Sequence, residues 1–120
     1  MIILTSPEAR GTQPEHAEAL EEAGATLVTV EGRGIAAGLR ALAGLGIQSV
    51  LLEGGAEVHA AAWDEGVVDY VQLYVAPVSV GSQGVPFLDR RSFSTASLIE
   101  PAVTALGPDV VIEGYVHRPH

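Results

Sequence analysis

The sequence predicts an α/β fold, with a mostly parallel sheet and helices on both of its faces. Short runs of apolar and β-branched residues alternate with segments in which apolar residues recur at helical spacing, up to about residue 76. Parallel strands need a long crossover between them, usually a helix, so this alternation favours a parallel sheet. The remaining residues predict a loop followed by an antiparallel hairpin.

The first elements are a strand and a helix. Residues 2–5 form an apolar run, and Ser6-Pro7 is interpreted as the exit from that strand. Pro14 suits the first turn of a helix, which Gly24 would end.

The middle of the chain predicts two further strands with a helix between them. Residues 26–30 are rich in β-branched side chains, which indicates a strand. Residues 34–45 carry apolar side chains at helical spacing and predict an amphipathic helix. Residues 48–52 form a nearly unbroken apolar run, typical of a strand covered on both faces.

The second half predicts a helix over residues 54–63, a strand over 69–76 and a loop over 77–88. Residues 97–103 and 110–117 then predict the two strands of a hairpin. Proline at position 101 favours an edge position for the first of them, because it has no N–H to donate to a ladder.

The composition excludes several classes of protein. Apolar residues make up 48% of the chain and charged residues 18%, which indicates a folded domain. The net charge of −9 argues against a nucleic-acid partner. We expect no membrane partner and no signal peptide, because no apolar run is long enough to span a bilayer and the start lacks a basic leader. Since the chain has no cysteine, we expect a cytoplasmic location.

Two glycine turns are candidates for a phosphate-bearing cofactor. The first, at residues 32–38, follows a strand and opens a helix, with Glu53 about 20 residues further on, as in a dinucleotide fingerprint. Its third glycine comes one residue late, and an ordinary glycine-rich helix entry explains it better. The second, Glu53-Gly54-Gly55-Ala56, ends a predicted buried strand and would aim backbone N–H groups outward at a helix start. A tight turn with a surface glutamate is the alternative for this second motif.

Several blocks of the sequence resemble one enzyme family along nearly the whole chain. They are Gly46-Ile47-Gln48-Ser49-Val50-Leu51-Leu52-Glu53-Gly54-Gly55-Ala56, Gly66-Val67-Val68-Asp69, Leu73-Tyr74-Val75-Ala76-Pro77 and Leu106-Gly107-Pro108-Asp109. Together they resemble the C-terminal reductase domain of the bifunctional deaminase/reductase of bacterial riboflavin biosynthesis. The resemblance implies a three-layer fold like that of dihydrofolate reductase.

The resemblance also implies a function and a site. The reaction would be the NADPH-dependent reduction of the ribosyl side chain of a phosphoribosylaminopyrimidine to the ribityl form. Glu53 would contact this phosphorylated pyrimidine substrate, and Ser6 would lie at the adenosine end of NADPH. The other cofactor contacts would be Gly54, Gly55, Ala56, Glu57, Val58 and His59. The turn at residues 32–38 would then be a plain helix entry.

The sequence also departs from the family. Family domains are about twice this length, so residues 1–120 would be a single reductase-like domain truncated at its N-terminal side, and no catalytic residue can be assigned. We expect a homodimer or a partner chain to cover the exposed sheet edge. The alternative function is a non-catalytic half-domain that binds nucleotide or supports another chain.

The remaining polar residues give weaker signals. His16, His59, His117 and His120 lack the spacing of a helical metal site, so no metal is expected. His59 is a possible cation beside a phosphate or a partly exposed helix residue. The pair Arg90-Arg91 is a possible phosphate grip or an ordinary surface pair.

Overall fold

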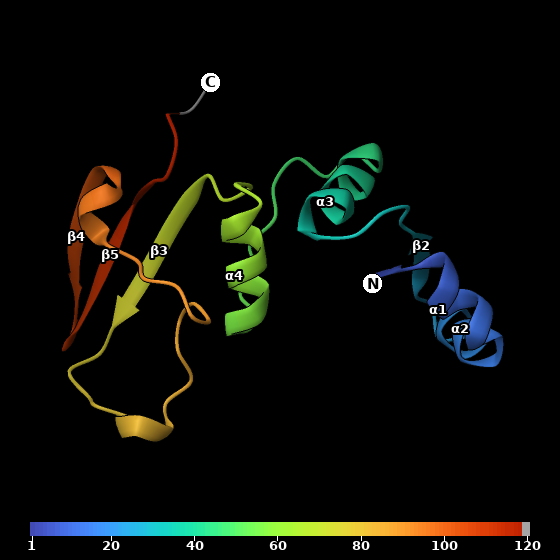
Figure 1. The fold of residues 1–120 in the computed structure, drawn as a ribbon, viewed down its shortest axis with the longest axis horizontal. Coiled ribbons are helices and arrows are strands. Elements are labelled where there is room, and N and C mark those ends of the chain that lie inside the picture. The colour runs from blue at the N-terminus through green and yellow to red at the C-terminus, as the bar shows by residue number, and fades with distance from the viewer. Residues whose placement is uncertain (119–120) are drawn as a thin grey trace. The chain divides into compact units, whose positions relative to one another are not determined.

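The computed structural model describes residues 1–118, and the chain forms two compact units. The N-terminal unit is Met1–Leu52 and the C-terminal unit is Glu53–His120 (Figure 1). Each unit is described by itself below. No helix within residues 1–118 is long and apolar enough to cross a membrane.

The N-terminal unit is a parallel pair of strands with three helices. Strand β1 (Ile2–Thr5) pairs with β2 (Thr26–Thr29), and the crossover between them carries α1 (Pro7–Thr12) and α2 (Pro14–Glu22). Helix α3 (Ile35–Gly44) follows β2. The predicted strands at residues 2–5 and 26–30 and the helices beginning near residues 14 and 34 are therefore confirmed.

Helix α1 was not predicted, although its start signals are present. The Ser6 hydroxyl accepts a hydrogen bond from the Ala9 N–H at 3.1 Å, and Pro7 occupies the first turn. Serine caps and prolines in the first turn are common helix starts. The helix has six residues, too few for an apolar periodicity to show, so Ser6-Pro7 indicates only the exit from the strand.

The C-terminal unit is one helix and a three-stranded antiparallel sheet. Its elements are α4 (Ala56–Asp64), β3 (Tyr70–Val75), β4 (Ile99–Leu106) and β5 (Asp109–Tyr115), with 3₁₀ turns at Gly81–Gln83 and Thr95–Ser97. The strand order is β3-β5-β4 (Figure 1). The helix predicted from residue 54 and the C-terminal hairpin are confirmed.

The hairpin also confirms the edge position of Pro101. Strand β4 lies at the edge of the sheet, and its pairing with β5 shifts between Ile99 and Ala102. Glu100 has a φ of 52°, which marks the bulge. Pro101 thus lies where the ladder is interrupted and its missing N–H costs nothing.

Two expectations about the sheet are wrong. Residues 48–52 do not form a strand, and most of them are exposed, Leu51 at 77%. The strands described in residues 1–118 make one parallel pairing and two antiparallel pairings, so the sheet is not mostly parallel. An apolar β-branched run becomes a strand only where a neighbour pairs with its N–H and C=O groups, and residues 48–52 have none among the described strands. The three-layer arrangement implied by the resemblance stays a prediction.

Candidate functional site

The turn before α4 leaves its backbone open to a ligand. Gly55 caps the helix with φ 75° and ψ 143°, a conformation that side chains rarely adopt. A Cβ built on Gly55 would meet no atom within 4 Å. The His59 N–H donates to the Gly55 carbonyl at 3.0 Å, so the N–H groups before it have no acceptor within the helix. Such a helix start receives anions well.

A pocket of about 430 Å³ lies at this turn. Its lining comes from the first turn of α4 and from the segment after β3: Gly55, Ala56, Glu57, Val58, Val85, Pro86 and Asp89. The Asp89 N–H donates to the Ala56 carbonyl at 3.3 Å and ties the two segments together. The volume falls within the range of small-molecule sites. The structure therefore brings the predicted residues Gly55, Ala56, Glu57 and Val58 onto one cavity.

His59 holds the loop that forms the other wall. Its Nδ1 lies 3.2 Å from the Phe87 carbonyl oxygen, and the two rings are 5.5 Å apart. A carbonyl oxygen can only accept, so Nδ1 carries the proton and donates it. Contacts between the rings of Phe87, Phe93 and Trp63 continue this packing along α4. His59 does not line the pocket.

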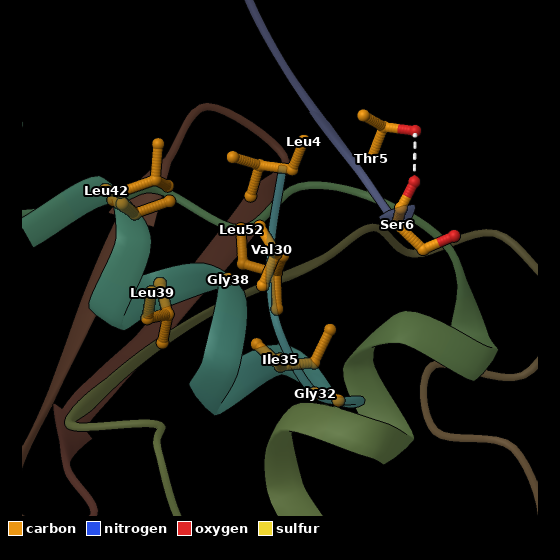
Figure 2. A pocket seen from close by; sticks show the side chains of 12 residues that line it. Leu4, Thr5, Ser6, Val30, Gly32, Ile35, Gly38, Leu39, Leu42 and Leu52 are labelled. Carbon is orange, nitrogen blue, oxygen red and sulfur yellow. Dashed lines mark hydrogen bonds between the residues drawn. The ribbon is translucent and has the colours of Figure 1, made fainter. Parts of the chain in front are cut away.

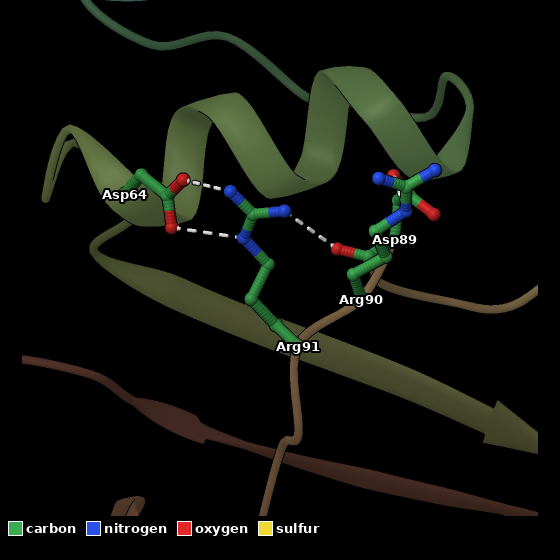
Figure 3. A network of polar contacts seen from close by, with 4 residues as sticks. All are labelled: Asp64, Asp89, Arg90 and Arg91. Atoms are coloured by element: carbon green, nitrogen blue, oxygen red, sulfur yellow. Dashed lines mark hydrogen bonds and ion pairs between the residues drawn. The ribbon is translucent and has the colours of Figure 1, made fainter.

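An ion pair clamps the same loop onto the end of α4 (Figure 3). The Arg91 guanidinium binds both carboxylate oxygens of Asp64, with Nε 3.1 Å from Oδ1, and also donates to the Asp89 carbonyl at 2.8 Å. The hydrogen bond from Arg91 lowers the pKa of Asp64. Arg91 is thus engaged within the fold. Arg90 is 88% exposed, with its Nε 3.8 Å from Asp89.

The charged side chains that line the pocket are acidic, whereas the backbone at the start of α4 offers N–H donors. Glu57 and Asp89 belong to the lining, which contains no cationic side chain. The exposed Glu53 and Gly54 immediately precede this turn but are not part of the lining. Asp89, Val85 and Pro86 were missed in the sequence because they lie in a loop without a motif. The carboxylates suit hydroxyl donors, and the helix start suits phosphate oxygens.

The N-terminal unit has a pocket of its own, of about 330 Å³ (Figure 2). Its apolar lining comes from Leu4, Val30, Ile35, Leu39, Leu42, Val50 and Leu52, and its remaining lining from Thr5, Ser6, Gly32, Gly34 and Gly38. It lies where the parallel strands β1 and β2 end, and ligands of open α/β sheets bind at this end of the strands.

Ser6 and the first glycine turn share this pocket. Gly32 and Gly34 have φ values of 97° and 90°, so the turn requires glycine at both positions. Because β1 and β2 are parallel, the residues that follow them meet at the same edge. This signal is present in the sequence, although the family resemblance implies a plain helix entry for the turn. Ser6 belongs to the N-terminal unit and Glu53, Gly54, Gly55, Ala56, Glu57, Val58 and His59 to the C-terminal unit.

Among residues 1–118 no group of three His, Asp or Glu side chains could hold a metal ion. His120, one of the four histidines considered above, lies outside the described residues.

Comparisons with known proteins give the family. The model of the RibD C-terminal domain matches residues 1–112. The riboflavin biosynthesis protein RibD of Chlamydia trachomatis serovar D is 39% identical over 75 residues, which cover 61% of this chain and 20% of that protein. The chain thus aligns with about one fifth of the length of that relative. These matches confirm the resemblance found in the sequence: the chain belongs to the RibD C-terminal domain family.

Proposed function

We propose that the chain is a reductase domain of riboflavin biosynthesis that uses NADPH to reduce the ribosyl side chain of a phosphoribosylaminopyrimidine. The family match over residues 1–112 and the name of the Chlamydia relative support a role in this pathway. The observation that best supports NADPH as the cofactor is the turn at Gly55. There the backbone at the start of α4 is free of neighbouring atoms and lines a pocket.

The pocket of the C-terminal unit has groups for two parts of a nucleotide. The N–H groups at the start of α4 would bind phosphate oxygens, which the net charge of −9 otherwise disfavours. The carboxylates of Glu57 and Asp89 would accept hydrogen bonds from ribose hydroxyls. The lining thus combines N–H donors for phosphate oxygens with carboxylate acceptors for ribose hydroxyls, and these residues fit a nucleotide such as NADPH.

The pocket of the N-terminal unit suits the adenosine end. Its leucine, isoleucine and valine side chains offer an apolar surface to a flat ring. The Ser6 hydroxyl accepts from the Ala9 N–H and keeps its own proton to donate to a ligand.

When bound, NADPH supplies the hydride that reduces the sugar carbon. The chain would orient the reactants rather than react with them. Glu53 is exposed immediately before the turn, and its carboxylate would accept hydrogen bonds from the sugar hydroxyls of the substrate.

Paired substitutions at Gly55 test the cofactor site. Gly55→Asp and Gly55→Asn impose the same backbone strain and nearly the same volume, but only the first adds a negative charge. We expect Gly55→Asp to weaken NADPH binding at least about tenfold relative to Gly55→Asn, because a fixed charge opposes the pyrophosphate. Calorimetric titration of the two folded variants measures this. Equal affinities would place the pyrophosphate elsewhere, and the pair Gly34→Asp and Gly34→Asn would then test the first glycine turn.

We further propose that a second copy or another chain covers the edge of the antiparallel sheet. Val103 and Leu106 of the edge strand β4 are 69% and 56% exposed. A chain that binds NADPH without reducing the pyrimidine would support the non-catalytic alternative, in which a partner supplies the remaining groups.

A further inference from the structure

The loop of residues 85–89 supplies one wall of the α4 pocket, and two contacts attach this loop to the helix. His59 Nδ1 donates to the Phe87 carbonyl at 3.2 Å, and the Asp89 N–H donates to the Ala56 carbonyl at 3.3 Å. Ala56 and His59 are three residues apart on α4, so the two contacts lie about one helical turn apart. Asp89 supplies the only carboxylate of this wall. The place of that carboxylate therefore depends on how the loop is attached.

The loop conformation needs such attachments. Arg90, which directly follows the loop, has a φ of 53°, in the left-handed region that residues other than glycine seldom adopt. A residue keeps this conformation only where the contacts around it enforce it. The Phe87 side chain is 40% exposed, so its packing alone holds the loop weakly. Arg91 donates to the Asp89 carbonyl and secures the end of the loop, whereas His59 secures its middle.

We infer that His59 is a positioning residue of the nucleotide site. Through the Phe87 carbonyl it holds the loop so that the Asp89 carboxylate lies where ribose hydroxyls would meet it. This inference rests on the proposed function, because it assumes a nucleotide in the α4 pocket. His59 does not line that pocket, so it acts through the loop and not on the ligand. A site whose wall is in place for only a fraction of the time has its affinity reduced by that fraction.

Substitutions of His59 separate its hydrogen bond from its bulk. Asparagine carries an amide N–H on the atom bonded to Cγ, where histidine has Nδ1, and leucine has no donor. We expect His59→Leu to weaken NADPH binding at least about threefold, within the value of one hydrogen bond. We expect His59→Asn, whose helix propensity is similar to that of histidine, to stay within about twofold of the wild type. Calorimetric titration of the full chain measures this, and His59→Ala replaces the leucine variant if that variant does not fold.

The fluorescence of Trp63 distinguishes positioning from direct contact with the nucleotide. Trp63 is the single tryptophan of the chain. Its ring packs edge-on against Phe93, and the Phe93 ring contacts the Phe87 ring. A loop released from His59 should therefore leave Trp63 more accessible to solvent. Without ligand, we expect acrylamide to quench Trp63 more strongly in His59→Leu than in the wild type, and equally in His59→Asn and the wild type.

His16→Leu is the matched control, because His16 is an exposed histidine of α2 that lines neither pocket. It should change neither the NADPH affinity nor the quenching.

Equal NADPH affinities of the wild type and His59→Leu would overturn the inference and leave the proposed function in place. Equal losses of affinity in His59→Leu and His59→Asn would do the same, because the hydrogen bond would then not matter. A weaker affinity of His59→Leu with unchanged quenching of Trp63 would also overturn the inference, since His59 would act without the loop. A folded wild type that binds no NADPH would overturn both the inference and the proposed function.

Discussion

Asp64 and Arg91 hold the loop that forms one wall of the α4 pocket. Because Arg91 lowers the pKa of Asp64 below its usual 3.8, the carboxylate is favoured in the folded state. The pKa of Asp64 is lower in the folded state than in the unfolded state. The ion pair with Arg91 therefore stabilises the fold fully at pH values above the unfolded-state pKa. That contribution is lost as the pH falls through the folded pKa.

We therefore expect Asp64→Asn to lower the thermal midpoint at neutral pH and to speed tryptic cleavage after Arg90 and Arg91. The difference in thermal midpoint from the wild type should disappear when the pH is lowered through the acid range. Protonated Asp64 is then uncharged, as asparagine is at every pH. Midpoints measured across that range check this. Glu18→Gln is the control, since Glu18 is an exposed carboxylate that forms no ion pair among residues 1–118. A midpoint of Asp64→Asn equal to that of the wild type at neutral pH would contradict the clamp.

At the scale of elements, Gly114 allows the bulge of β4 to lie against β5. A Cβ at this buried position would approach the Leu98 Cβ at 3.0 Å and the Ile99 carbonyl oxygen at 3.1 Å. Neither atom is the far end of a flexible side chain, so the backbone would have to move. The edge strand that carries Pro101 would be displaced.

We expect Gly114→Ala to destabilise the C-terminal unit by about 1–3 kcal/mol, the usual effect of overpacking. Gly44→Ala should be neutral or stabilising by up to about 1 kcal/mol, because a Cβ there meets nothing within 4 Å and alanine favours the helix. Urea unfolding of the two variants measures the difference. A Gly114→Ala variant as stable as wild type would show that the bulge tolerates a methyl group.

The elements show what the sequence could predict and where it failed. Strands and helices with a clear local signal were predicted well, including the glycine that opens α4 and the proline at the edge of the hairpin. Residues 48–52 have the composition of a strand, but pairing depends on a neighbour that no local pattern specifies. The glycine turn in the sequence predicts the wall of the α4 pocket that the start of the helix forms. Its other wall, with Asp89, depends on the long-range contacts of Arg91 and His59, which the sequence does not reveal.

At the scale of the whole molecule, the family match extends through both units. Each unit has a pocket beside a glycine turn that opens a helix, and each turn depends on glycine at positive φ. The chain has six Lys and Arg side chains and fifteen Asp and Glu side chains. The proposed anionic cofactor would therefore depend on local groups, such as the N–H groups before α4, rather than on the overall field.

The most direct test of the central claim is the titration of the full chain with NADPH, followed by addition of the phosphoribosylaminopyrimidine. The proposed function predicts saturable binding, and then loss of the near-ultraviolet absorbance of NADPH as the ribosyl group is reduced. A folded chain that shows no saturable NADPH binding would contradict it.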